Sequence, residues 1–222
     1  MIATIYRVTL RTQAKKGRMA ALIIFGLVGV IVGLAIGVSD VEDPVRAATN
    51  MVNAFGLSLY APVVTLVFAS ASLGDPAEDG TLVYFWLRPV ARWQIAAGTY
   101  LATLSVALPL VLVSLVLAAT LSGAGHGLVP GTFVSATLAV IAYGGIFTWL
   151  GLRVRRALVW GLAYILLWEG FVASAGRSAA RLAVRAYTRS VLHNATGVDL
   201  KLATISEFYA IVIPVVIGIA MA

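Results

Sequence analysis

Long charge-free stretches alternate with short polar segments along the chain. The main ones cover residues 19–39, 47–74 and 93–152. As a helix, the first would be about 31 Å long, which is enough to cross the hydrocarbon core of a bilayer. The third is too long for one helix, and a cluster of Gly and Pro residues at 123–131 divides it. The pattern predicts an all-α, polytopic membrane protein.

The full pattern predicts six transmembrane helices in a single transmembrane domain, residues 1–222. The spans are expected at about 19–39, 57–74, 95–121, 132–152, 157–175 and 206–222. The last is the least clear, because it is short and contains Pro214.

Basic residues indicate the orientation. With six spans and an inside N-terminus, most Lys and Arg residues fall on the inside, as the positive-inside rule requires. These are Arg7, Arg11, Lys15, Lys16, Arg18, Arg88, Arg92, Arg153, Arg155 and Arg156. We therefore expect both termini to be cytoplasmic, with the chain in a cell membrane, the plasma membrane of a bacterium.

Residues 1–18 predict an amphipathic interfacial helix ahead of the first span. Ile2, Ile5, Tyr6 and Thr9 share one side, and the basic residues from Arg7 onward share another. Such a helix can anchor in lipid or brace a cytoplasmic partner.

Residues 75–94 form the most informative polar segment. Asp75 can cap a helix that has Pro76 in its first turn and Glu78 at the third position. Pro89 disfavours helix in the residue before it, so this helix should be short. Aromatic residues at 84–86 occupy its middle. The segment can either dock a partner or lie on the bilayer surface.

The same segment resembles the region between the second and third spans of ABC-2 type transporter permeases. The matching residues are Glu78, Asp79, Gly80, Thr81, Leu82, Pro89, Arg92, Ile95 and Gly98. The family often has Lys after that last glycine, whereas this chain has Thr99. The six-span plan and the amphipathic N-terminus agree with the resemblance.

The resemblance implies the membrane subunit of an ABC exporter. Such a permease pairs with a second permease subunit, identical or different, and docks a cytoplasmic ABC ATPase through a short coupling helix. Residues 78–82 with Arg88, Pro89 and Arg92 would make that contact. The chain contains no phosphate-binding Gly-x-x-x-x-Gly-Lys-Ser/Thr motif. ATP and Mg would therefore bind the partner, and no cofactor is expected in this chain.

Two features inside the spans are candidates for function. Gly29, Gly33 and Gly37 recur every four residues and form a smooth helix face, suited to packing within the chain or between subunits. Glu169 lies within the fifth predicted span. A carboxylate there can line an ion or substrate pathway, or can be hydrogen-bonded near the membrane surface.

Residues 176–204 are expected to form an external helical loop. Arg177, Arg181, Arg185 and Arg189 recur every four residues and would form one basic stripe on a helix. The stripe can contact anionic lipid headgroups or guide an anionic substrate.

Composition limits the chemistry. Of the residues, 61% are hydrophobic and 11% charged, and the net charge is +7. In a membrane protein this charge sets topology, so no nucleic-acid partner is expected. The chain has no Cys and only two His residues, so neither a metal site nor catalytic residues are expected. Two alternatives to a transporter stay open: a membrane-embedded lipid-modifying enzyme, and a non-transporting membrane anchor or immunity protein.

Overall fold

The computed structural model describes residues 2–13, 15–78, 91–125, 127–154, 156–171, 180–200 and 205–221. The described part is all-α. Its elements are α1 (Ile2–Gln13), α2 (Lys16–Val38), α3 (Pro44–Met51), π-helical η1 (Val52–Tyr60), α4 (Ala61–Glu78), α6 (Arg92–Leu121), α7 (Leu128–Arg153), α8 (Ala157–Ala163), π-helical η2 (Tyr164–Phe171), α10 (Val184–Thr196) and α11 (Glu207–Met221).

Four helices are long and apolar enough to cross a membrane. They are α2, the continuous helix Pro44–Ser72, α6 and α7. The apolar helices Ala157–Phe171 and Glu207–Met221 are shorter. The described residues thus give four candidate spans and two shorter apolar helices in place of the six spans predicted. The end of the predicted fifth span, 172–175, lies outside the described residues.

The second membrane-length helix begins well before the predicted residue 57. Pro44 occupies its first turn, and the Asp43 carboxylate accepts a hydrogen bond of 2.9 Å from the backbone N–H of Arg46. A proline and an acidic cap together favour a helix start. The helix then continues through η1 into α4 without a break.

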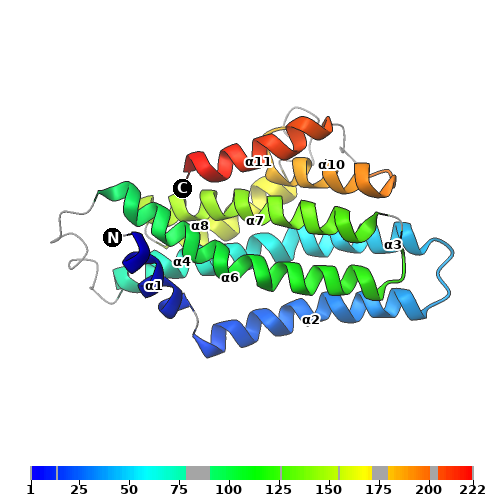
Figure 1. The fold of residues 1–222 in the computed structure, drawn as a ribbon, viewed down its shortest axis with the longest axis horizontal. Coiled ribbons are helices and arrows are strands. Elements are labelled where there is room, and N and C mark those ends of the chain that lie inside the picture. Colours follow the sequence, from blue (N-terminus) through cyan, green and yellow to red (C-terminus); the bar gives the residue numbers. More distant parts are fainter. Residues whose placement is uncertain are drawn as a thin grey trace.

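The membrane-length helices lie side by side along the long axis of the molecule (Figure 1). The helix Pro44–Ser72 and α7 are central, because 67% and 61% of their most apolar stretches are buried. The corresponding values for α2 and α6 are 22% and 33%, so these two helices are peripheral.

The two ends of the bundle differ. Both termini, α1, the end of α4 and the start of α6 lie at one end, which we call the termini end (Figure 1). The connections from α2 to α3 and from α6 to α7 lie at the opposite end. The second connection includes Gly127, whose φ of 75° favours glycine.

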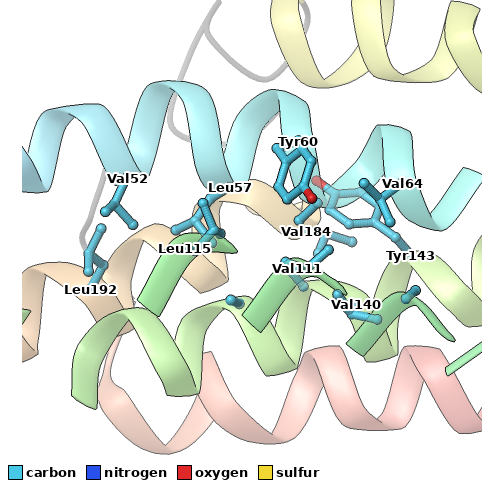
Figure 2. Close-up of a cluster of buried hydrophobic side chains, with 14 of the residues drawn as sticks. Val52, Leu57, Tyr60, Val64, Val111, Leu115, Val140, Tyr143, Val184 and Leu192 are labelled. Carbon is cyan, nitrogen blue, oxygen red and sulfur yellow. The ribbon is translucent and has the colours of Figure 1, made fainter. Parts of the chain in front are cut away.

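The main core lies between η1 and α4, α6, α7 and α10. Figure 2 shows Leu57 beside Leu115 of α6, with Tyr60 and, from α10, Val184 and Leu192 in the same cluster. These five side chains are almost fully buried. The short helix α10 is therefore part of the packed bundle.

The N-terminal helix is amphipathic, as predicted, and its buried face contacts protein. Ile5, Thr9 and Gln13 are buried, whereas Arg7 and Arg11 are exposed. A side chain at Gly98 of α6 would collide with Ile5, so α1 lies directly on α6.

The glycines of α2 allow close approach within the chain. A Cβ at Gly33 would overlap the backbone carbonyl of Ala118, and one at Gly37 would overlap that of Leu121. Gly29 faces the ring of Phe55 in η1. Helices α2 and α6 thus meet almost backbone to backbone.

Candidate functional site

A buried carboxylate joins two distant segments inside the bundle. Glu169 of η2 is 2% exposed. Its Oε1 accepts hydrogen bonds from the backbone N–H of Val184, at 3.1 Å, and from the Tyr164 hydroxyl, at 3.2 Å. Its Oε2 accepts a bond of 3.3 Å from the backbone N–H of Arg185. Glu169 therefore caps the first turn of α10.

The local sequence explains why α10 needs this cap. The residue before the helix is Ala183, which has no side-chain oxygen to accept from the first turn. Ala183 and Val184 are both buried, so the helix begins in the interior of the protein. An unsatisfied buried N–H is costly, and the positive end of a helix favours a carboxylate. Glu169, on another helix, provides both the hydrogen-bond acceptor and the negative charge.

Two arginines of α10 and the amide of Asn53 extend this polar cluster toward η1. The Arg189 Nε donates a hydrogen bond of 3.2 Å to Asn53 Oδ1. Burial first, and then the charge of Arg185, lower the pKa of Arg189 to about 10, while Glu169 opposes that shift. The Arg189 guanidinium consequently stays protonated at neutral pH. The Arg185 Nε is buried and has no hydrogen-bond partner among the described residues.

Two phenols complete the cluster on the side of α7 and η2. The Tyr143 hydroxyl of α7 is buried and lies close enough to Glu169 to interact with it electrostatically. No hydrogen bond of standard geometry joins this hydroxyl to any described residue. Tyr164 donates directly to the carboxylate. We call Asn53, Tyr143, Tyr164, Glu169, Arg185 and Arg189 the Glu169 cluster.

The Glu169 cluster connects the two π-helical segments. Asn53 belongs to η1, and Tyr164 and Glu169 belong to η2. Short π-helical segments inside α-helices occur frequently at functional sites. The site can hold a conformation through charge and hydrogen bonding. Across the described residues, no group of three or more His, Asp or Glu side chains could hold a metal ion.

The predicted coupling residues lie either at the termini end of the bundle or outside the residues that the structure describes. Glu78 ends α4 and Arg92 begins α6. The remaining ones lie outside the described residues: Asp79, Gly80, Thr81, Leu82, Arg88 and Pro89.

The arginines differ from the single surface stripe that their spacing predicts. Arg177 lies outside the described residues. Arg181 is exposed in a turn, because α10 begins only at Val184. Arg185 and Arg189 are half-buried in the Glu169 cluster. The position at which α10 begins decides that Arg185 and Arg189 face the cluster. The spacing of the arginines alone does not reveal where the helix begins.

Sequence reasoning missed three members of the Glu169 cluster: Asn53, Tyr143 and Tyr164. One signal was present, since Asn53 is one of two amides, with Asn50, in the charge-free stretch 47–74. The two tyrosines gave none, because tyrosine is common in apolar helices and at their ends.

No protein-family model matches the chain, and no curated protein matches its sequence. The fold and the cluster define a class: an all-α protein whose four apolar, membrane-length helices indicate a multi-pass membrane protein, with a buried polar cluster among them.

Proposed function

We propose that the chain is the transmembrane permease subunit of an ABC-2 type exporter. A separate cytoplasmic ABC ATPase, which binds ATP and Mg, drives its alternating access. A second permease subunit completes the pathway. The proposal also places both termini in the cytoplasm. Its starting point is the motif at residues 78–98, and one observation in the described residues supports it further.

That observation is the position of Gln13, the last residue of α1. The side chain is completely buried between α4 and α6. Its Nε2 donates hydrogen bonds to the Phe68 carbonyl of α4, at 3.1 Å, and to the Thr103 hydroxyl of α6, at 3.0 Å. Those two helices bound the motif segment. A partner pushing on the segment would therefore act on helices that α1 already links.

The Glu169 cluster supports the same proposal from further along the bundle. It holds a helix that begins inside the bundle against η1 and η2. Alternating access requires an element with two arrangements. A buried polar cluster between three segments is suited to that role, because its bonds can be exchanged as the segments shift.

The decisive experiment alters the motif and measures the partner. Changing Glu78 and Asp79 to Lys should repel a basic groove on the ATPase, since like charges across an interface cost several kcal/mol. Gly80→Trp should block close approach sterically. Each tagged variant is purified in detergent from its native membrane. We expect both variants to be well expressed and to lose a co-purifying ABC ATPase.

Asp40→Lys with Glu42→Lys is the matched control. It makes the same charge change in an exposed loop at the opposite end of the bundle, and it should retain the ATPase. Retention of the ATPase by both motif variants, or its absence from the wild type, would contradict the proposal. Turnover of a lipid by the purified chain without any ATPase would favour the enzyme alternative.

A further inference from the structure

An apolar groove runs along the surface between α2 and α6. Its volume is about 540 Å³. Two of its lining residues carry a hydroxyl, Ser105 and Ser114. Each hydroxyl donates to a carbonyl of its own helix, at 2.9 Å in both cases. The remaining lining residues are apolar. The groove therefore suits a hydrocarbon ligand.

The length of the groove matches one leaflet of a bilayer. On α2 it extends from Met19 to Val30, or about 16 Å at the usual helical rise. Half of the hydrocarbon core is about 15 Å thick. An acyl chain entering at Met19 would reach the middle of the bilayer near Val30.

One end of the groove is basic. Lys15 and Lys16 precede Met19 by four and three residues, and both are exposed. Lys16 opens α2 and, three residues before Met19, lies on the same side of the helix, while Lys15 is the extended residue just before it. At the same end, Tyr6 of α1 donates a hydrogen bond of 3.1 Å to Ser105. The junction of α1 and α2 thus sets cations at the mouth of the groove.

We infer that this groove binds one acyl chain of an anionic phospholipid, with its phosphate against Lys15 and Lys16. Length and charge together select this occupant. A neutral lipid would fill the groove equally well but would gain nothing from the lysines. A helix of a second copy would need no basic mouth. The inference concerns a site for lipid and does not depend on an ATPase.

The test uses the absence of native cysteines. Val113, which lines the groove and is 59% exposed, is changed to Cys and labelled with bimane. The full chain is reconstituted with brominated phosphatidylglycerol or brominated phosphatidylcholine in a neutral lipid background. We expect the anionic lipid to quench at an about fivefold lower mole fraction for each participating lysine.

Ile24→Cys is the matched control, because Ile24 lies on α2, the other helix that borders the groove, and is 64% exposed but does not line the groove. The two brominated lipids should quench it alike. Adding Lys15→Gln and Lys16→Gln should abolish the preference at position 113. Equal quenching at 113 by both lipids would overturn the inference. Quenching by neither lipid would also overturn it, since a second copy would then cover the groove.

Native mass spectrometry of the unlabelled chain gives an independent readout. We expect about one phosphatidylglycerol to remain bound per chain, and Val113→Trp to remove it by filling the groove. Ile24→Trp should keep it. Loss from both variants, or retention by both, would contradict a specific site in the groove.

Discussion

Glu169 Oε2 lies 3.3 Å from the backbone nitrogen of Arg185, and so a carboxylate sixteen residues away caps the helix that carries Arg185. Helix α10 consequently begins inside the packed bundle, where its first N–H groups need a hydrogen-bond acceptor from the protein. Buried backbone groups must be satisfied by protein in such surroundings. This one contact explains why an acidic residue is placed in an otherwise apolar helix.

Replacing Glu169 by Gln should destabilise the protein. The amide keeps one acceptor oxygen, and its NH₂ group would face a backbone donor. Leaving a buried donor unsatisfied costs about 1–3 kcal/mol. Thermal unfolding of the purified chain in detergent measures the effect. Glu207→Gln changes an exposed acid at the start of α11 and should leave the midpoint unchanged.

Arg189 and Arg181 should respond differently to the same substitution. Arg189→Gln removes the guanidinium donor to Asn53 and a half-buried charge near Glu169, so the unfolding midpoint should fall. Arg181→Gln alters an exposed side chain and should be within about 0.5 kcal/mol of the wild type. Equal effects would support the surface-stripe interpretation of these arginines.

Gln13→Leu should loosen α1 from the bundle. It removes both donors to Phe68 and Thr103 while keeping a similar volume. We expect earlier proteolysis of the N-terminal residues and a loss of about 1–2 kcal/mol of stability. Thr12→Ala removes a hydroxyl that donates to the Thr9 carbonyl of its own helix, and serves as control. Unchanged proteolysis of the Gln13 variant would argue against a linking role.

Gly33→Leu should separate α2 from α6. A side chain there meets the Ala118 backbone, which cannot move aside as a flexible side chain could. Overpacking of this kind costs about 1–3 kcal/mol. Gly17→Leu is the comparison, because a Cβ at Gly17 has open space around it. The measurement is the thermal unfolding midpoint of each purified variant in detergent. Equal midpoints for the two variants would contradict the close packing.

Orientation can be read from two single cysteines at opposite ends of the bundle. With cytoplasmic termini, an impermeant maleimide should label Asp40→Cys on intact cells. Arg153→Cys, at the end of α7, should be labelled only after lysis. Labelling of Arg153→Cys from outside would reverse the proposed topology.

The sequence alone determined the all-α class and the positions of the apolar helices. Charge-free stretches are long-range, additive signals, so α2, α6 and α7 lie close to their predicted ranges. The amphipathic face of α1 was equally readable, because helical periodicity fixes which residues share a side. Helix boundaries were harder to predict from the sequence. Asp43 and Pro44 begin a helix that hydropathy alone would start later.

Only the tertiary structure decided what the polar residues do. Glu169 and Arg185 lie on different helices, and nothing in their spacing reveals that one caps the other. The direction of Arg189 follows from where α10 begins, and that start depends on a cap from η2. The groove between α2 and α6 likewise arises only when both helices are packed. Contacts between elements depend on the whole fold, whereas hydropathy and periodicity are properties of each segment by itself.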